Sequence, residues 1–537
     1  MKKNVLIFRK YLIYSGLLLI VIASVGIRWP LLDVPLERDE GEYAYAGQLI
    51  LQGIPPYKLI YNMKLPGIYG IYALLLASFG QTHKGIHFGL LLINTATIII
   101  IFFLARRLIN SMTGISVAAC FALLSVGQSV QGVFANSEHF VIFFALSSAL
   151  LLLKGTESNQ ILLLFFSGML AGLGFLVKQH GAAFMVFGFV FLITEQIRGI
   201  SIPFRHFIYR IILFSIGAVL PYVFTCIFLY IMGVFDKFWF WTVNYAIAYT
   251  TQTSLNHAFN RLLSQTIKIV QTAPLIWTIS LFGFIALFVN KNLKSKLNYI
   301  FLFFIFSFIA ICPGFYFRPH YFILILPVTA ILAGVGTYTI TNILEKTPLN
   351  NNKTSLSMLI LIICIGASLF QQRSFLFQMT PKQACKSIYG LNPFSESIEI
   401  NQVIQTLTQK DDRIVVLGSE PQIYFYSNRR SATGYIYMYP MMEVHEYAKQ
   451  MQIEMIKEIE AAEPEVLIIV NVYTSWLSRP NSNKQIFEWL DNYHTKHYSM
   501  VGLIEITMNK TSYYWLSNIE WPPKSKAWML ILKRKKN

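Results

Sequence analysis

Four carboxylates lie within six residues of the chain, Glu37, Asp39, Glu40 and Glu42, directly after the first long apolar segment. Asp39 and Glu42 have the spacing of a helix capping box, which accounts for one or two of these acids. Four like charges so close together repel one another and must be solvated or paired. A carboxylate can accept a proton from a bound hydroxyl group. Asp39, with Glu40 beside it, is therefore a candidate catalytic group.

Lys64 follows these acids in the segment YNMKLPG, after the turn GIPPY. Two interpretations stay open. Lys64 is either a snorkelling side chain beside a turn or a cation directed at an anion such as a lipid phosphate, which an ammonium binds as a point charge. Nearby aromatic side chains are candidates for lining the bound substrate, namely Tyr43, Tyr57 and Tyr61.

Three later segments place ionisable groups at the ends of apolar runs. They are ANSEH with Glu138, LVKQHG with Lys178, and RPHY with Arg318 and His320. Each has an alternative explanation in helix capping or in a charge placed favourably at a helix end. Ionisable groups at membrane depth are costly and usually functional. If all three segments face the same side, Glu138 is a further catalytic candidate, placed to face Asp39, and the cations are candidates for binding an anion.

The elements that must position these residues are membrane helices. The chain has 537 residues, of which 55% are hydrophobic and only 13% charged, against roughly 25% charged in soluble proteins. The net charge of +18 does not gather into one basic stripe, and the sequence has no nucleic-acid-binding module, so we expect no nucleic-acid partner. The five cysteines have no metal-ligand spacing and imply no disulfide framework.

About eleven apolar stretches are long enough to approach the ~20 residues of a membrane span. The N-terminal stretch has no clear cleavage site and is expected to remain as the first span. A short apolar run at 65–80 is expected to be re-entrant or interfacial. The eleven expected spans are 11–30, 86–105, 112–128, 138–153, 160–177, 181–197, 208–232, 274–290, 298–312, 319–343 and 356–371.

Lysines and arginines indicate the orientation. With the N-terminus in the cytoplasm, each inside loop carries positive charge, as the positive-inside rule requires. The outer side then holds loops 31–85 and 233–272, the candidate residues, and the tail. The basic residues of the expected inside segments are Lys2, Lys3, Arg9, Lys10, Arg106, Arg107, Lys154, Arg198, Arg205, Arg210, Lys291, Lys294, Lys296, Lys346 and Lys353.

The tail, residues 372–537, is expected to form an α/β domain outside the membrane, following a transmembrane domain at 1–371. RIVVLGS (413–419) and EVLIIVN (465–471) are short β-branched runs typical of buried strands. Between them a helical pattern stops before Pro464. Trp476 and the tyrosines of 435–439 could stack on sugars or serve in packing, and both interpretations stay open.

DEGEYAYAGQLILQGIPPY, followed by NMKLPGIYGIYALLLASFG, resembles the first outer loop of the polytopic C-type glycosyltransferases. It is most similar to the bacterial branch with the protein O-mannosyltransferases and lipid A aminoarabinose transferases. The three later segments resemble family segments in the same order, over roughly residues 10–345. The resemblance implies a helical membrane domain and a variable outer domain. It also implies transfer of a sugar from a polyprenyl-phosphate donor to a glycan, lipid or protein acceptor, at the outer face of the bacterial cytoplasmic membrane and among its lipids.

The resemblance also implies roles for single residues. Asp39 would act at the acceptor, and Lys64 would bind the donor phosphate, helped by the cations Lys178, Arg318 and His320. The aminoarabinose transferases have a metal-holding glutamate beside this lysine, where Met63 stands here. The sequence thus supports no metal site and names no cofactor, although a divalent metal stays open.

The main alternative from another class is a transporter or flippase of lipid-linked sugars. Such proteins favour repeats and broken spans that meet at the membrane midplane. In this chain the ionisable groups gather at one membrane face instead, which favours the enzyme.

Overall fold

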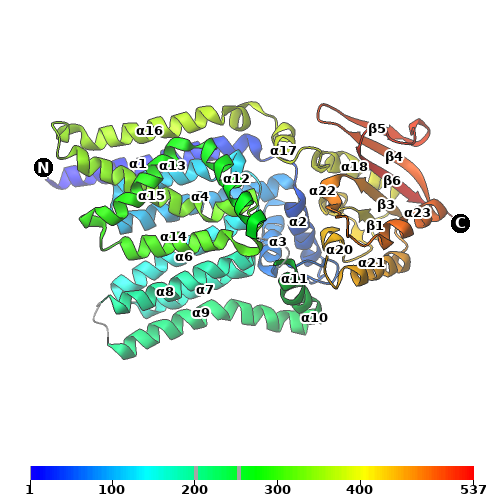
Figure 1. Ribbon diagram of the computed structural model, residues 1–537, viewed down its shortest axis with the longest axis horizontal. Helices are drawn as coiled ribbons and strands as arrows, with labels where there is room; N and C mark the ends of the chain where they lie inside the picture. The colour runs from blue at the N-terminus through cyan, green and yellow to red at the C-terminus, as the bar shows by residue number, and fades with distance from the viewer. Residues whose placement is uncertain (1, 199–202, 251–254, 537) are drawn as a thin grey trace. The chain divides into compact units, whose positions relative to one another are not determined.

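The computed structural model describes residues 2–198, 203–250 and 255–536, and the chain folds into two compact units (Figure 1). We name them the helical unit and the mixed unit. The helical unit comprises 1–32, 87–227 and 250–379, and the mixed unit comprises 33–86, 228–249 and 380–537. The predicted first outer loop thus packs with the C-terminal segment. The functional division at residue 371 stays a prediction.

The helical unit consists of long apolar helices, and the protein is a multi-pass membrane protein. Among the described residues, seven helices are long and apolar enough to cross a membrane, or up to eight if the bent pair α12 and α13 is one span. Three further expected spans correspond to the shorter apolar helices α5, α7 and α14. Each of the eleven expected spans is thus an apolar helix in the structure. The helices run over Lys2–Arg28 (α1), His83–Leu108 (α4), Ser111–Leu124 (α5), Ser137–Ser158 (α6), Ile161–Val177 (α7), Ala182–Ile197 (α8), Phe204–Ile231 (α9), Leu255–Thr272 (α12), Pro274–Val289 (α13), Leu297–Ile311 (α14), Leu326–Leu344 (α15) and Lys353–Gln371 (α16).

A proline explains the one clear difference from the expected spans, and one expected loop proves to be helical. The span predicted from residue 319 begins as α-helix only at Leu326, because Pro327 occupies its first turn and residues 319–324 form a 3₁₀ turn. The predicted outer loop 233–272 is largely helical, with α10 (Phe235–Trp239), α11 (Ala246–Thr250) and α12. Pro274 opens α13, which is bent by 109° from α12.

Three basic residues from the expected inside segments lie together at one end of the helical unit. Lys10, Arg106 and Lys353 line one cavity of about 430 Å³, where α1, α4 and α16 meet. At the other end of α1, the guanidinium of Arg28 donates to the backbone carbonyls of Gly132 and Ser125, each at 2.8 Å. The helices thus run from one charged end to a second polar end.

The C-terminal part of the mixed unit contains a six-stranded sheet of order β2-β1-β3-β6-β4-β5. Strands β2, β1 and β3 are parallel, with Ile414 opposite Val466, and β6, β4 and β5 continue the sheet antiparallel. The predicted strands β1 and β3 and the helix α21 between them are confirmed. The strands are Arg413–Leu417 (β1), Arg430–Ser431 (β2), Val466–Asn471 (β3), Tyr498–Ile506 (β4), Thr511–Trp515 (β5) and Ala527–Arg534 (β6).

Short helices surround this sheet (Figure 1). They are Pro381–Tyr389 (α17), Phe394–Leu407 (α18), Gln422–Ser427 (α19), Tyr439–Met442 (α20), Ala448–Ala462 (α21), Tyr473–Trp476 (α22) and Gln485–His497 (α23). The mixed unit also contains α2 (Arg38–Leu51) and α3 (Pro66–Phe79), from the segment predicted to be the first outer loop.

Helix α2 begins at a capping box formed by Glu37 and Glu40. Each side chain accepts a hydrogen bond from the other residue's backbone amide, at 3.0 and 3.1 Å. The expected box of Asp39 and Glu42 is therefore wrong by two residues. Glu37 has the extended backbone of an N-cap residue, whereas Asp39 already belongs to the first helical turn.

Glycines allow α2 to approach its neighbours at backbone distance. A Cβ atom on Gly41 would lie 2.6 Å from the backbone nitrogen of Gln422 in α19, and one on Gly47 would lie 2.8 Å from that of Ala73 in α3. Any larger residue would separate these elements. The acidic helix is therefore held directly against both α3 and the C-terminal segment.

Candidate functional site

Asp39 and Lys64 form an ion pair inside the mixed unit. The ammonium of Lys64 lies 2.7 Å from Oδ1 of Asp39, and the two side chains are 19% and 17% exposed. Asp39 comes from the first turn of α2, and Lys64 comes from the loop that ends where Pro66 starts α3. The close crossing of these helices brings the two charges together.

Glu42 is the second carboxylate on this lysine. One helical turn after Asp39, its Oε2 accepts from Lys64 at 2.7 Å and from the amide of Asn62 at 2.9 Å, and its Oε1 accepts from the hydroxyl of Tyr69 at 2.5 Å. The side chain is completely buried. A buried carboxylate is tolerated only when its oxygens are satisfied in this way.

Burial raises the pKa of Glu42, and the neighbouring Lys64 and Tyr69 oppose this effect. Burial alone would lower the pKa of Lys64, yet it lies above its ordinary value because Asp39 and Glu42 stabilise the ammonium. Lys64 is therefore charged at neutral pH, and it offsets the negative charge of the acidic helix.

Aromatic side chains enclose the ammonium of Lys64. It lies 4.6 Å from the ring centre of Tyr43 and 5.1 Å from that of Tyr437, distances at which an aromatic face attracts a cation. Tyr57 is buried and donates its hydroxyl to the Lys64 carbonyl at 2.7 Å. Its contact supports the lysine backbone.

Tyr61, the third tyrosine proposed to line the substrate, lies farther along the same loop. Its hydroxyl donates to Glu458 at 3.1 Å. Its ring stacks on Trp241 and lies 4.4 Å from the ammonium of Lys237. Tyr61 thus connects the loop to α21 and to the segment 228–249.

The four acids of the opening segment divide into two pairs. Glu37 and Glu40 use their carboxylates to close the start of α2, while Asp39 and Glu42 bind Lys64. Burial and the neighbouring Asp39 and Glu40 hold the pKa of Glu37 well above its usual range. Of the two residues first proposed as catalytic, Asp39 therefore has the contacts of a site residue and Glu40 those of a cap.

A second group of ionisable residues lies in the helical unit. Lys178, which ends α7, contacts Oε1 of Glu138 in α6 at 2.5 Å. His320 approaches the same oxygen at 4.0 Å, and its other ring nitrogen lies 3.0 Å from Oε1 of Gln131. The Lys178 ammonium also lies 4.5 Å from the ring centre of Tyr321. Three residues predicted from separate segments are thus brought together.

Arg318, the remaining predicted cation, precedes the 3₁₀ turn that leads into α15. Its guanidinium lies 5.8 Å from the ring centre of Tyr316.

The carboxylates around Lys64 do not fit a divalent metal. The position between Asp39 and Glu42 is filled by the lysine ammonium, which contacts both acids at 2.7 Å. Met63 offers no carboxylate beside it. Among the described residues, no group of three or more His, Cys, Asp or Glu side chains is arranged to hold a metal ion.

Sequence reasoning missed three members of this site. Glu42 lies three residues after Asp39, so helical spacing places the two acids on one face and could have identified it. Asn62 lies beside the lysine but has no distinguishing spacing. Tyr437 donates its hydroxyl to Asp39 at 2.8 Å, although the two residues are 398 positions apart in the sequence. The only sequence signal for Tyr437 is its place in a tyrosine-rich run.

Comparisons with known proteins bear on this arrangement. Residues 64–228 match the family model of the dolichyl-phosphate-mannose-protein mannosyltransferases, a segment that begins at Lys64. No curated protein matches the sequence significantly.

Solved structures match nearly the whole chain. The oligosaccharyltransferase of Archaeoglobus fulgidus in the apo form has a TM-score of 0.57 at 12% identity, covering 96% of this chain and 75% of its own. AglB from the same organism, solved with an inhibitory peptide and a dolichol-phosphate, has a TM-score of 0.56 at 11% identity, covering 97% and 76%. ArnT from Cupriavidus metallidurans, bound to undecaprenyl phosphate, has a TM-score of 0.56 at 12% identity and covers 97% of both chains. The resemblance to the polytopic C-type glycosyltransferases is thus confirmed, by the family model over residues 64–228 and by a fold shared along nearly the whole chain.

Proposed function

We propose that this protein transfers a sugar from a polyprenyl-phosphate-linked donor to a glycan, lipid or protein acceptor. The observation that carries this proposal is the fold match along nearly the whole chain to AglB and ArnT, which were solved with dolichol-phosphate and with undecaprenyl phosphate. The mannosyltransferase family model over residues 64–228 supports the same reaction class.

In the proposed reaction the acceptor hydroxyl group binds at Asp39. Its oxygen forms a bond to the anomeric carbon of the sugar as the bond from that carbon to the phosphate oxygen breaks. The proton passes to the carboxylate of Asp39, and the lipid phosphate leaves with the bonding electrons. A phosphate is stable as an anion, so this step needs cations at the leaving group more than a protonating acid.

The donor phosphate requires a cation. Lys64 is the residue that the family resemblance places there, and its ammonium lies 2.7 Å from Asp39, the proposed base. We therefore assign the donor phosphate to Lys64. Lys178 and His320 lie against Glu138 in the helical unit, and their help in binding the donor stays a prediction, as does that of Arg318.

The reaction is proposed to occur at the outer face of a bacterial cytoplasmic membrane, with the N-terminus inside. Three basic residues of the expected inside segments, Lys10, Arg106 and Lys353, line one cavity at one end of the helical unit. This arrangement agrees with the positive-inside rule. Lipid-linked donors suit an outer site because nucleotide sugars are absent there.

The test uses purified protein in lipid nanodiscs, a panel of polyprenyl-phosphate sugars, and a membrane extract as acceptor. Wild type is compared with Asp39→Asn, which keeps the shape of the side chain but cannot accept the proton. We expect one donor to be consumed by wild type and the variant to be slower by roughly 10²–10⁴-fold. An unchanged melting temperature would show that Asp39→Asn still folds.

Two results would contradict the proposal. Full activity of Asp39→Asn would remove this residue from the reaction. Movement of a fluorescent lipid-linked sugar across proteoliposome membranes without any glycosylated product would establish the transporter alternative instead.

A further inference from the structure

We propose that Tyr437, from the C-terminal segment, is a positioning residue for Asp39 and that this segment thereby completes the transferase site. The inference rests on the proposed function, since it gives a role to the same carboxylate. The C-terminal region would then help to position a catalytic group, in addition to any role in selecting the acceptor.

The geometry at Asp39 carries the proposal. The hydroxyl of Tyr437 donates to Oδ1 of Asp39 at 2.8 Å, and Lys64 donates to the same oxygen at 2.7 Å. Two donors on one oxygen fix the rotation of the carboxylate about its Cβ–Cγ bond. Burial, together with Asp39 and Glu42, holds the pKa of Tyr437 well above its usual value, so its hydroxyl keeps its proton and acts as the donor.

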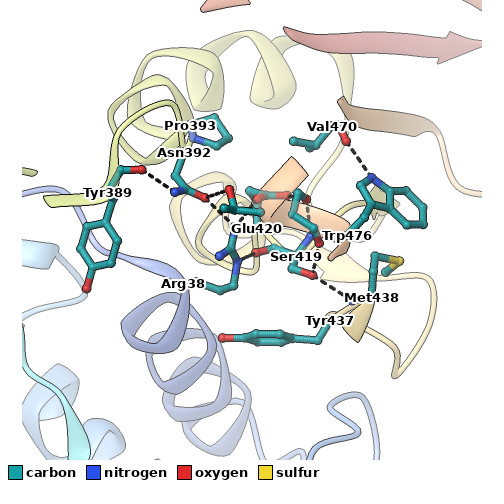
Figure 2. A network of polar contacts seen from close by, with 12 residues as sticks. Arg38, Tyr389, Asn392, Pro393, Ser419, Glu420, Tyr437, Met438, Val470 and Trp476 are labelled. Atoms are coloured by element: carbon teal, nitrogen blue, oxygen red, sulfur yellow. Dashed lines mark hydrogen bonds and ion pairs between the residues drawn. The ribbon is translucent and has the colours of Figure 1, made fainter. Parts of the chain in front are cut away.

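The backbone next to Tyr437 is held in place by the end of β1. The amide of Met438 donates to the hydroxyl of Ser419 at 2.9 Å. That hydroxyl donates in turn to the carbonyl of Ser475 at 2.5 Å, while the Ser475 hydroxyl accepts from the backbone amide of Ser419 at 2.8 Å. Figure 2 shows this network between Ser419, Met438 and the neighbouring segment. The tyrosine therefore approaches Asp39 from a segment that is hydrogen-bonded to the residues following β1.

Arg38, the residue before Asp39, ties the acidic helix to the same place. Its guanidinium donates to Glu420 and to the side-chain oxygen of Asn392, each at 2.9 Å, and its Nε donates to the Ser419 carbonyl (Figure 2). The side chain of Glu420 is completely buried. Ser419 thus contacts Arg38 through its carbonyl and Met438 through its hydroxyl. These two residues are the chain neighbours of Asp39 and Tyr437.

Removing the hydroxyl should make Asp39 easier to protonate, because a hydrogen bond to a carboxylate favours its charged form. The ordered position of the carboxylate is lost at the same time. The substitution leaves the other ionisable groups around Asp39 unchanged, namely Glu37, Arg38, Glu42, Lys64 and the neutral hydroxyls of Tyr72 and Tyr389.

The experiment compares wild type, Tyr437→Phe and Tyr435→Phe in the nanodisc transfer assay across pH. The control is matched, because Tyr435 lies two residues away and donates its hydroxyl to another carboxylate, Glu454, at 2.9 Å. For Tyr437→Phe we expect kcat to fall about tenfold, the value of one hydrogen bond to a charged group. The KM for the lipid donor should stay unchanged, and the acid limb of the pH–rate profile should move up by about one pH unit.

Other results would overturn the proposal. A rate and pH profile equal to wild type would show that the hydroxyl does not act on Asp39. Equal losses in both variants, with an unmoved pH profile, would reveal only a structural role for this tyrosine run.

Failure of the proposed function would be recognised separately, because wild type would then consume no donor. The contact itself would then be judged by melting Asp39→Asn, Tyr437→Phe and the double variant. Non-additive changes in the free energy of unfolding would support coupling between Asp39 and Tyr437, and additive changes would refute it.

Discussion

The ammonium of Lys64 lies 2.7 Å from Oε2 of Glu42, a carboxylate with no exposed surface. Lys64 brings a positive charge to Glu42, whereas Asn62 and Tyr69 donate to the same carboxylate from neutral groups. The stability of this part of the mixed unit should therefore depend on the lysine, and it should do so in a pH-dependent way.

Lys64→Met should destabilise the mixed unit by about 3–5 kcal/mol near neutral pH, the cost of leaving a buried charge without its partner. Burial raises the pKa of Glu42 already in the wild type, and loss of Lys64 raises it further. The folded variant then binds a proton that the unfolded chain releases, so its stability falls as pH rises from about 4.5 through the folded pKa. Thermal melting from pH 4 to 9 measures the effect.

The matched control for this prediction is the double variant Lys64→Met/Glu42→Gln. With the carboxylate removed there is no buried charge to neutralise, so most of the stability should return and the additional pH dependence should disappear. A single variant that melts like wild type at every pH would contradict the view that Lys64 neutralises Glu42.

Chelators should leave activity unchanged. The ammonium of Lys64 already occupies the position between Asp39 and Glu42, where a divalent cation would otherwise bind two carboxylates. Transfer is measured with and without excess EDTA after overnight incubation, and a metal-dependent glycosyltransferase serves as the positive control. Loss of activity that Mg²⁺, Mn²⁺ or Zn²⁺ restores would show that a metal displaces the lysine during catalysis.

Much of the membrane architecture follows from composition. The eleven expected spans are all apolar helices, because hydrophobic length and loop charge are local signals that bilayer thickness imposes on the chain. The strands β1 and β3 were also predictable from a local signal, because buried parallel strands consist of runs of β-branched residues. The start of α15 was misplaced because a proline inside an apolar run changes the local backbone without changing hydropathy.

The site was predictable only where its partners are near in sequence or share a family motif. Asp39 and Lys64 lie in one recognisable segment, and the structure pairs them. Tyr437 reaches Asp39 from 398 positions away, and no local pattern specifies such a contact. The capping box was assigned to Asp39 and Glu42 because several acids in one short segment offer more than one register. Only the backbone conformation of Glu37 decides between them.

Glu420→Gln should weaken the attachment of the acidic helix to the C-terminal segment. Glu420 is completely buried and accepts from Arg38 at 2.9 Å and from Ser475 at 2.6 Å. Glutamine keeps the shape but leaves the guanidinium without its counter-ion, at a cost of about 3 kcal/mol. Thermal melting and limited proteolysis after residue 380 measure the loss.

Glu454→Gln is the control for this prediction. Glu454 contacts Lys237 at 2.5 Å, but the two side chains are 35% and 40% exposed, so solvent screens the pair and its loss should cost only about 0–1 kcal/mol. Equal destabilisation by both substitutions would mean that burial of the Arg38–Glu420 pair does not determine how much the pair contributes to stability.

Gly41→Ala should separate α2 from α19. The new Cβ would lie 2.6 Å from the backbone nitrogen of Gln422, and backbone atoms cannot turn aside as a flexible side chain can. Overpacking of this kind costs about 1–3 kcal/mol, more than the gain of up to about 1 kcal/mol that alanine brings to a helix. We expect a lower melting temperature and slower transfer, because Tyr437 would no longer reach Asp39.

Gly70→Ala in α3 distinguishes this steric effect from a general effect of replacing helix glycines in the mixed unit. A Cβ on Gly70 meets nothing within 4 Å, so this variant should gain up to about 1 kcal/mol from helix propensity alone and keep its transfer rate. If the two substitutions shifted the melting temperature in the same direction and by the same amount, the close approach of α2 to α19 would not be what holds Asp39 beside the C-terminal segment. Opposite shifts, with slower transfer only in Gly41→Ala, would tie the reaction to that contact.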